Sequence, residues 1–374
     1  MHGSAERRPN NKRRSEAMPL DTLPFPKSGL PGFASAPRKL RLVARHQNTS
    51  DTVTFTFHSL EGPVLHLPGQ AIALDLPMNG GVATRTFTIA SAPLGAQELS
   101  VTVKAAETGH ATRWMHDNLA VGSEITARGP FGRFSLAARH GRPVLLIGGG
   151  SGFTPMMSML RWLHARGETL DVVVVQVARR VEDLLFEDEL AQIARDMPGL
   201  RLFEVVTAPA AGEVWRGYRG RPNRAMLRAM VADASRREVY CCGPEGFLGT
   251  VRQCLLAEGL PHQHFHTESF GASKPVASPA PIGKGVSNGH RVTLRGRSFE
   301  IAEGELLSTA LAAQHIRVPT GCNAGQCGTC KLRLSEGSVD MQQDGGLSEQ
   351  DVASGYILAC CSRVTGPISI EDPV

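Results

Sequence analysis

Four of the eight cysteines have a spacing that indicates a metal centre. Cys322, Cys327 and Cys330 follow the pattern C-x4-C-x2-C, and Cys360 comes later in the chain. Cysteine thiolates bind iron, and three ligands from one short loop with a distant fourth are typical of a [2Fe-2S] cluster. The residues between the first three cysteines are mostly small, which lets the backbone pass close to inorganic sulfide. The spacing therefore predicts a [2Fe-2S] site held by these four cysteines.

A zinc site is the alternative use of four cysteines. Structural zinc sites are usually built from two short C-x2-4-C pairs. Here the second pair is missing, because Cys361 follows Cys360 directly. The pattern thus favours iron and sulfide over zinc. Since no secretion signal is recognisable, the cysteines also favour metal or redox chemistry over a disulfide framework.

The rest of the chain divides into regions of different character. Residues 1–37 are polar, basic and proline-rich, which predicts a disordered tail. Residues 38–141 contain short alternating segments separated by turns, which predict a small antiparallel β-barrel. Residues 271–288 are rich in Pro, Ala, Ser and Gly and predict a linker, and residues 289–374 form a compact module that contains the four cysteines.

Residues 142–270 have the pattern of an α/β domain. A short apolar strand is followed by the glycine-rich stretch 148–152 and by a helix that we expect to open at Thr154 and Pro155, with the threonine as its cap. Val172–Val175 is a continuous apolar run, typical of a parallel strand buried on both faces. Helices and strands then alternate, which predicts a doubly wound parallel sheet.

The C-terminal module resembles plant-type ferredoxins. The stretch Gly321–Lys331 matches the cluster-binding loop of that family, and Gly355–Cys360 matches the segment that carries its fourth ligand. The resemblance implies an α+β fold of the β-grasp type.

The barrel resembles the flavin domain of the ferredoxin–NADP reductase superfamily. Arg85-Thr86-Phe87-Thr88 is similar to the motif Arg-x-Tyr-Ser/Thr, in which arginine binds a flavin phosphate, the aromatic ring packs on the isoalloxazine and the hydroxyl lies near N5, where hydride arrives. The resemblance gives these roles to Arg85, Phe87 and Thr88. Phe87 departs from the motif because it lacks the phenol oxygen.

A second phosphate site follows along the chain. Gly109-His110-Ala111-Thr112 is similar to the family's Gly-x-x-Ser/Thr turn at the N-terminus of a short helix. Backbone N–H groups at such a terminus suit a pyrophosphate. The resemblance therefore implies contacts from Gly109, Ala111 and Thr112, and it favours FAD over FMN.

The glycine-rich stretch resembles the nicotinamide loop of the same superfamily. It is not a strict G-x-G-x-x-G, because Phe153 takes the place of the third glycine. It does end in Gly-x-Thr-Pro, as that loop does. The cofactor-binding residues implied by this match are Gly149, Gly150, Thr154 and Pro155.

Two further segments match this superfamily. Cys242-Gly243-Pro244 is its second nicotinamide landmark, which implies that Cys242 lies near the ring. A nucleophilic Cys242 is the alternative, although no base stands beside it in the sequence. At the end of the domain, the resemblance places Phe270 over the flavin face and lets Glu268 steady the nicotinamide ring. A core phenylalanine at a strand end is the alternative.

The identity of the nicotinamide donor stays open. Arg179 follows the second parallel strand, where the adenosine ribose lies, and it could hold a 2′-phosphate. No acid is recognised there to bind ribose hydroxyls, which favours NADPH, whereas similar reductases more often use NADH. His262, His264 and His266 alternate and predict an exposed strand edge, with metal binding as the alternative.

From about residue 40, the chain is most similar to the reductase component of glycine betaine and related quaternary-amine monooxygenases, through segments such as Trp215–Gly220 and Gly345–Ser348. The resemblance implies an NAD(P)H-dependent oxidoreductase. It would pass electrons from NADH or NADPH through FAD and the [2Fe-2S] cluster to a separate Rieske-type oxygenase. The alternatives are a reductase for hybrid-cluster protein or another non-Rieske monooxygenase, and a ferredoxin carrier without flavin.

Charge and hydropathy exclude other classes. The net charge of +5 is too small to indicate nucleic-acid binding, and no apolar run approaches the roughly 18 residues of a membrane span. We therefore expect a cytoplasmic protein. Residues 289–374 contain seven Lys/Arg and ten Asp/Glu, a charge of −3 that leaves +8 on the rest. An acidic C-terminal module could dock electrostatically on the basic remainder of the chain or on a partner. The alternative is that the uneven charge is simply solvated and has no role.

Overall fold

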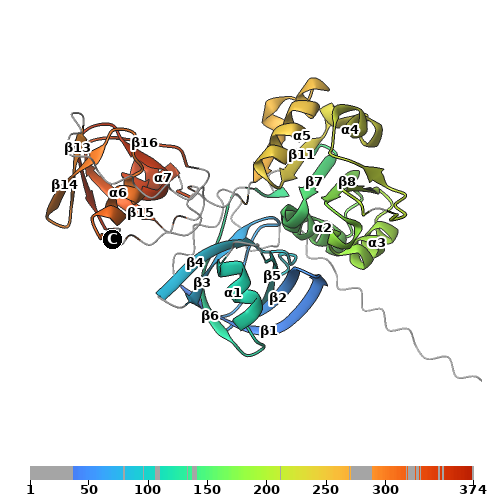
Figure 1. Ribbon diagram of the computed structural model, residues 1–374, viewed down its shortest axis with the longest axis horizontal. Coiled ribbons are helices and arrows are strands. Elements are labelled where there is room, and N and C mark those ends of the chain that lie inside the picture. The colour runs from blue at the N-terminus through green and yellow to red at the C-terminus, as the bar shows by residue number, and fades with distance from the viewer. Residues whose placement is uncertain are drawn as a thin grey trace, which may run out of the picture.

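The computed structural model forms three bodies, a barrel, an α/β domain and a C-terminal α+β domain (Figure 1). Residues 1–36 of the predicted tail, the predicted linker, Gly109, Cys322 and Cys327 lie outside the described residues. The structure describes residues 37–372 apart from 79–80, 96, 106–109, 133, 137–140, 211, 269, 271–288, 317, 319–324, 326–327, 329, 344–345 and 348.

The first body is an antiparallel sheet of six strands in the order β4-β3-β6-β1-β2-β5. A bridge between Ile89 and Val101 joins the two ends, so the sheet closes into the expected barrel. Side chains alternate along β2, where Phe55 and Phe57 are buried in the core. The elements are β1 (Arg38–Thr49), β2 (Thr52–Ser59), β3 (Ala71–Met78), β4 (Gly81–Thr88), β5 (Glu98–Lys104), α1 (His110–Asn118) and β6 (Glu124–Phe131).

The second body is a parallel sheet in the order β10-β9-β8-β7-β11-β12. Helices α2 and α3 pack on one face, against Leu146 and Val174, and α4 and α5 pack on the other, against Leu145 and Val173. This is the doubly wound architecture expected from the sequence. The elements are β7 (Val144–Gly149), α2 (Thr154–Ala165), β8 (Val172–Ala178), α3 (Glu187–Asp196), β9 (Leu200–Val206), β10 (Tyr218–Arg219), α4 (Arg224–Met230), β11 (Glu238–Cys242), α5 (Glu245–Ala257) and β12 (Phe265–Glu268).

Helix α2 begins differently from the prediction. The glycine loop first makes a short 3-10 helix, η3 (Gly150–Phe153), so Phe153 rather than Thr154 is the residue before α2. Thr154 is the first helical residue, and its hydroxyl donates to the carbonyl of Ser151 at 3.0 Å. The expected helix start is thus correct, but the expected threonine cap is wrong.

The third body is a mixed five-stranded sheet in the order β14-β13-β19-β15-β17, in which only the described pair β13–β19 is parallel. Helix α6 packs against it through Leu307 and Leu311. This arrangement agrees with the expected α+β β-grasp fold. The elements are β13 (Gly289–Leu294), β14 (Arg297–Ala302), α6 (Leu307–Ala313), β15 (Lys331–Glu336), β16 (Val339–Met341), α7 (Glu349–Ala353), β17 (Tyr356–Leu358), β18 (Ser362–Val364) and β19 (Ile368–Glu371).

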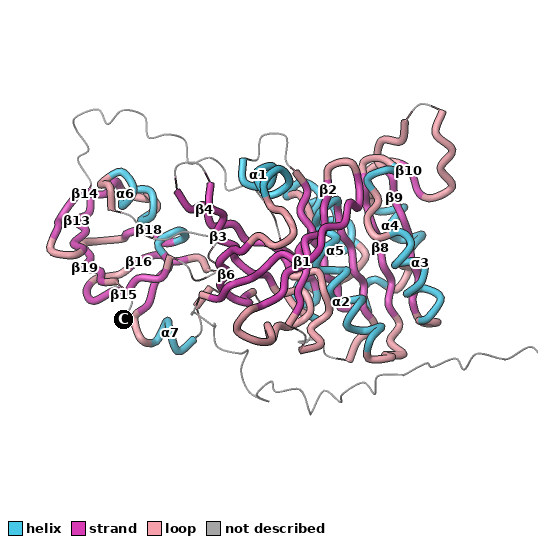
Figure 2. The backbone as a smooth tube through the Cα atoms, turned by 90° about the horizontal axis from the view of Figure 1, so that it is seen from below, coloured by secondary structure: helices cyan, strands magenta, loops and turns pink. Residues whose placement is uncertain are grey.

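Along the long axis of the molecule, the barrel lies between the other two bodies, and the three form a bent arrangement (Figure 1, Figure 2). Hydrophobic contacts join the barrel to the α/β domain, because Phe134 and Leu136 pack in the same core cluster as Met159 of α2. In the described part of the chain, no helix has the length and apolar character needed to cross a membrane.

Candidate functional site

A cleft of about 540 Å³ opens at the C-terminal ends of β7, β8 and β11, where the α/β domain meets the barrel. The corresponding edge of an open parallel sheet is where nucleotides bind. The cleft brings together residues that are far apart in the sequence. The predicted cofactor residues that line it are Gly149, Gly150, Arg179, Gly243, Pro244 and Phe270.

The glycines of this cleft are required by close packing. A Cβ on Gly152 would lie 2.5 Å from the carbonyl oxygen of Cys242. A Cβ on Gly149 or Gly243 would lie 3.2 or 2.8 Å from the ring of Phe247 in α5. The glycine-rich stretch 148–152 and the turn at Gly243 therefore pack on one another and on this ring. Their backbone remains open to the cleft. Such a cradle fits the pyrophosphate of a nicotinamide dinucleotide.

Two residues predicted to bind the dinucleotide do not line the cleft. Thr154 is 2% exposed and bonds to Ser151, and Pro155 is buried in the first turn of α2. Both residues form the start of α2, which supports the glycine loop without lining the cleft.

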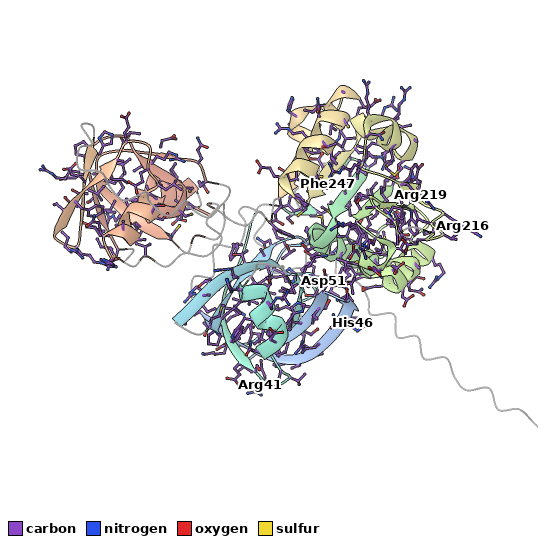
Figure 3. All side chains as sticks on the ribbon, viewed as in Figure 1. Arg41, His46, Asp51, Arg216, Arg219 and Phe247 are labelled. Carbon is purple, nitrogen blue, oxygen red and sulfur yellow. The ribbon has the colours of Figure 1, made fainter. Side chains whose placement is uncertain are left out.

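The sequence analysis missed two barrel residues of the cleft, Thr52 and Lys104. The Lys104 ammonium lies 2.8 Å from the carboxylate of Asp51 and 4.0 Å from that of Asp183 in the α/β domain. Figure 3 shows Asp51 at the end of the barrel that faces the α/β domain. A cation therefore reaches the nucleotide cleft from the barrel. In the sequence, the only sign of this residue is that a lysine ends β5, whose central residues are all buried.

The expectation that no acid stands at the ribose position is wrong. Asp183, four residues after Arg179, lines the same cleft. It lies in a 3-10 turn and accepts a hydrogen bond from the backbone N–H of Arg180 at 3.1 Å. The cleft thus offers both an arginine and a carboxylate after β8, so its chemistry is compatible with either NADH or NADPH.

Cys242 is fully buried, and it pairs with Glu268 in the register of β11 and β12. Two of the three predicted catalytic residues are therefore neighbours. Burial raises the pKa of the Cys242 thiol well above its usual range, and the nearby Glu268 carboxylate raises it further. The thiol stays protonated, which argues against the nucleophilic alternative.

The third, Thr88, is at the end of β4 and is only 3% exposed. In the described part of the chain, its hydroxyl has no hydrogen-bond partner, and the same is true of the Thr86 hydroxyl. Buried hydroxyls normally have a partner, so this position fits a bound group that supplies one. Arg85 is exposed, and one of its Nη atoms donates to the carbonyl of Thr84. Phe87 packs at the edge of the barrel core.

Helix α1 begins at His110, and Gly109 before it is not among the described residues. Ala111 is buried and Thr112 is in the first turn. The expected helix N-terminus is therefore present, and Ala111 packs in the same hydrophobic cluster as Phe87. The binding of a pyrophosphate there stays a prediction.

Of the four predicted cluster ligands, the structure describes Cys330 and Cys360. They are 1% and 5% exposed, and the backbone N–H of Cys360 donates to the sulfur of Cys330 at 3.4 Å. Hydrogen bonds with Cys330 and Cys361 lower the pKa of Cys360 to about 3. The two sulfurs are therefore adjacent and suited to act as thiolate ligands.

The backbone around these cysteines is also tightly packed. Gly325 and Gly328 have φ values of +69° and +67°. A Cβ on Gly346 would lie 2.4 Å from the carbonyl oxygen of Gly325. Close backbone approach of this kind is what a cluster-binding loop needs, so the described half of the site fits a [2Fe-2S] cluster.

The predicted exposed histidine edge is only partly correct. Strand β12 is at the edge of its sheet, but His264 and His266 both hydrogen-bond to the buried carboxylate of Glu238. His266 also stacks on Tyr240 with ring centroids 4.8 Å apart. Among the described residues, no group of three or more His, Cys, Asp and Glu side chains could hold a metal ion.

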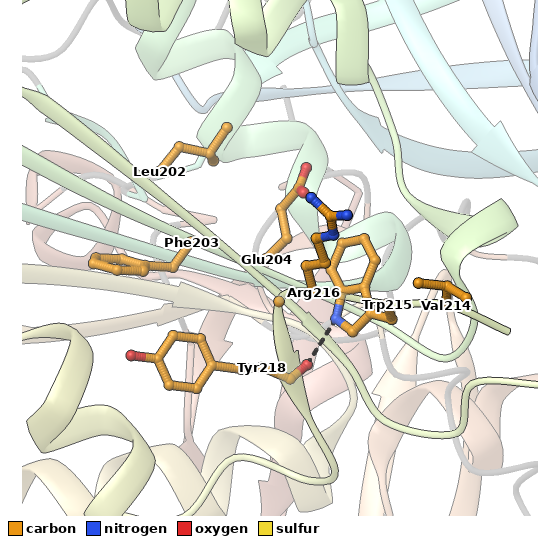
Figure 4. A pocket seen from close by; sticks show the side chains of 8 residues that line it. Leu202, Phe203, Glu204, Val214, Trp215, Arg216 and Tyr218 are labelled. Carbon is orange, nitrogen blue, oxygen red and sulfur yellow. Dashed lines mark hydrogen bonds between the residues drawn. The ribbon is translucent and has the colours of Figure 1, made fainter.

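A second hollow, of about 620 Å³, lies at the other edge of the parallel sheet (Figure 4). Trp215, Arg216 and Tyr218 form it together with Glu204 of β9, and the indole N–H of Trp215 donates to the carbonyl of Tyr218. Burial and the neighbouring Glu187 raise the pKa of Glu204. None of the predicted site residues lines this hollow.

Comparison with known proteins agrees with this geometry. Residues 39–136 match the oxidoreductase FAD-binding domain, 146–253 the oxidoreductase NAD-binding domain, and 291–365 the 2Fe-2S iron-sulfur cluster binding domain. Each match falls within one of the three bodies.

Similarity also extends over whole proteins. The chain is 40% identical to the stachydrine N-demethylase reductase subunit of Rhizobium meliloti, over 91% of this chain and 98% of that one. It is 34% identical to the glycine betaine monooxygenase reductase subunit of Pseudomonas aeruginosa, over 91% and 96%. Among solved structures, phthalate dioxygenase reductase has a TM-score of 0.57 and 25% identity over 91% of this chain and 98% of that one. The chain therefore belongs to the family of NAD(P)H-dependent oxidoreductases with FAD and [2Fe-2S] domains that includes these reductase subunits.

Proposed function

We propose that this reductase takes hydride from NADH or NADPH in the cleft and delivers single electrons, through its C-terminal domain, to a separate Rieske-type oxygenase. The observation that carries the hydride step is the convergence of Gly149, Gly243 and Phe270 in one cleft at the boundary with the barrel. FAD supplies the needed chemistry, because it accepts an electron pair and can release electrons singly. One hydride therefore supports two successive single-electron deliveries.

Individual roles follow from the positions of the side chains. The unpaired buried hydroxyl of Thr88 supports a contact near flavin N5, and the pairing of Cys242 with Glu268 supports a place for both beside the nicotinamide ring. The remaining proposed contacts are Arg85, Thr86 and Phe87 for the flavin, Gly109, Ala111 and Thr112 for its pyrophosphate, Phe270 for the flavin face, and Cys322, Cys327, Cys330 and Cys360 for the cluster.

The substrate class of the oxygenase follows from the relatives. Those with 34–40% identity are named for stachydrine and glycine betaine, which are both quaternary amines. We therefore propose an oxygenase of the quaternary-amine class as the acceptor. A relative from Rhodococcus rhodochrous with 30% identity is the ferredoxin reductase component of 3-ketosteroid-9-alpha-monooxygenase, which favours a steroid oxygenase as the second candidate.

Reconstitution tests the choice of partner. The purified reductase is mixed with NADH or NADPH and, in turn, with a stachydrine, a glycine betaine or a ketosteroid oxygenase, and product is measured against nucleotide consumed. We expect product with a quaternary-amine oxygenase at nearly one product per nucleotide. Product with the ketosteroid enzyme alone would overturn the proposed class, and no product with any of them would overturn the oxygenase partner.

We also propose a cytoplasmic location. The described cysteines outside the cluster domain, Cys241, Cys242 and Cys254, form no disulfide with one another, as expected in a reducing compartment. Cell fractionation tests this, and recovery of the mature protein with the periplasmic fraction would contradict it.

A further inference from the structure

Helix α2 joins the nucleotide cleft to the barrel. Its first residue, Thr154, is bonded to Ser151 of the glycine loop at 3.0 Å. Ser158 and Arg161 follow at intervals of four and three residues, so all three side chains lie on one face of the helix. Figure 1 shows α2 between the parallel sheet and the barrel. This face extends from the cleft to the barrel over about 10 Å, at the usual rise of an α-helix.

Ser158 binds two barrel segments at once. Its side chain is fully buried, and its hydroxyl accepts a hydrogen bond from the N–H of Gly69 at 3.2 Å and donates one to the carbonyl of Ser91 at 3.0 Å. Gly69 has little room to move, because it has φ +99° and its Cβ would lie 2.5 Å from the carbonyl oxygen of Phe134. The serine thus holds a tightly packed turn of the barrel.

Arg161 makes the next contact along the same face. One Nη donates to the carbonyl of Ala90 at 2.8 Å. The other Nη and Nε donate to the two carboxylate oxygens of Glu189 in α3, at 2.6 and 2.7 Å, and the guanidinium packs over the ring of Phe186. A guanidinium fixed in this way by α3 holds the Ala90 carbonyl in one position.

Both contacts lie just beyond Thr88, past its pairing with Ala71 at the end of β4. Ala90 is two residues after it in the chain. Gly69 is two residues before Ala71, which is the partner of Thr88 in the pairing of β3 with β4. Helix α2 therefore fixes the barrel at the point where the flavin motif ends.

We propose that Ser158 and Arg161 are positioning residues for hydride transfer, because they set the distance between the glycine loop and the end of β4. The inference rests on the proposed roles of the cleft and Thr88. Hydride transfer needs reacting atoms about 3–3.5 Å apart, and a displacement of about 1 Å can cost roughly 100-fold in rate. Neither side chain lines the cleft, so their loss changes this distance without removing a contact to the nucleotide.

The test compares Ser158→Ala, Arg161→Gln and the double variant with His164→Gln. His164 lies on the same helix but pairs with Asp196 of α3 at 3.0 Å, so it is a matched control for the helix without a described barrel contact. Anaerobic stopped-flow absorbance gives the limiting rate of flavin reduction and the nucleotide Kd, and 4-deuterated nucleotide gives the isotope effect. We expect a rate about tenfold lower in each single variant and about 100-fold lower in the double variant. Kd and flavin content should stay within about twofold of wild type, the isotope effect should rise, and His164→Gln should match wild type.

A wild-type rate in the double variant with bound flavin would overturn the proposal. Loss of flavin, or a raised Kd with an unchanged limiting rate, would also overturn it, because the residues would then act in binding. If Arg161→Gln does not fold, Ser158→Ala decides, since it removes a single hydroxyl. If neither nucleotide reduces the wild-type flavin, the proposed function fails before any variant is compared.

Discussion

At the scale of single residues, burial decides the chemistry of Cys242. Its thiol is fully buried and its pKa is raised, so it should remain neutral between pH 6 and 9. We predict that Cys242→Ser keeps the rate of flavin reduction within about tenfold, whereas loss of a covalent nucleophile costs on the order of 10⁶-fold. The rate measured against pH for both proteins checks this. Inactivation by iodoacetamide at pH 7 that Cys242→Ser prevents would contradict it.

Lys104 provides the second test at this scale. It is the barrel cation in the nucleotide cleft, and a charge-assisted contact of about 1.5–3 kcal/mol corresponds to roughly ten- to hundredfold in affinity. We predict that Lys104→Gln raises the nucleotide Kd at least about tenfold and leaves flavin content unchanged. Lys39→Gln is the control, because that lysine is exposed and bonds to Thr126 on the barrel surface. Equal Kd values for the two variants would contradict the role of Lys104.

At the scale of elements, a buried arginine ties the starts of three strands together. The Arg237 guanidinium is fully buried, bonds to both oxygens of Asp171 and of Asp233, and donates to the carbonyl of Val144. We predict that Arg237→Met lowers the free energy of unfolding by about 2–3 kcal/mol. This is less than for a fully buried pair, because both carboxylates are partly exposed.

Urea denaturation measures this loss, with Arg201→Gln as the control. Arg201 makes a longer, exposed contact of 3.4 Å with the same Asp171, so its loss should cost less than about 1 kcal/mol. Equal losses of unfolding free energy in the two variants would show that the burial of Arg237 adds nothing to stability.

The same group of charges predicts a dependence on pH. Hydrogen bonds from Arg237 lower the pKa of Asp171 and of Asp233 below the usual range. A lowered pKa in the folded state contributes stability above the unfolded value of about 4, and this contribution is lost as the pH falls further. We predict that Tm of the wild-type protein falls below about pH 4, and that Arg237→Met reduces this dependence. Parallel Tm curves between pH 3 and 6 would contradict it.

How far the sequence could predict the elements depended on their burial. Strands β7 and β8 are buried along their whole length, and their apolar runs marked them clearly. Strand β1 gave no such signal, because Leu40 and Leu42 are buried while most of its other side chains face solvent. The convergence of Gly149, Gly243 and Phe270 was predictable through family motifs. The roles of Lys104 and Asp183 could not be predicted, because they meet only through the packing of two domains and no local sequence pattern indicates this contact.

At the scale of the whole molecule, the barrel lies between the nucleotide-binding domain and the C-terminal domain (Figure 2). This order suits a path from the cleft through the barrel to Cys330 and Cys360. We predict that Cys360→Ser abolishes reduction of cytochrome c but spares reduction of ferricyanide, which flavin can perform directly. Both activities are measured with the same nucleotide, and equal loss of both would contradict this order of carriers.

Anaerobic titration of the purified protein with NADH or NADPH, followed by visible absorbance, tests the central claim most directly. Flavin takes two electrons and a [2Fe-2S] cluster one, so we predict that both the flavin bands and the broad iron–sulfur absorbance bleach with about 1.5 equivalents of nucleotide per chain. Bleaching that ends at about one equivalent, with flavin bands alone, would contradict an electron path that leaves the protein through an iron–sulfur cluster.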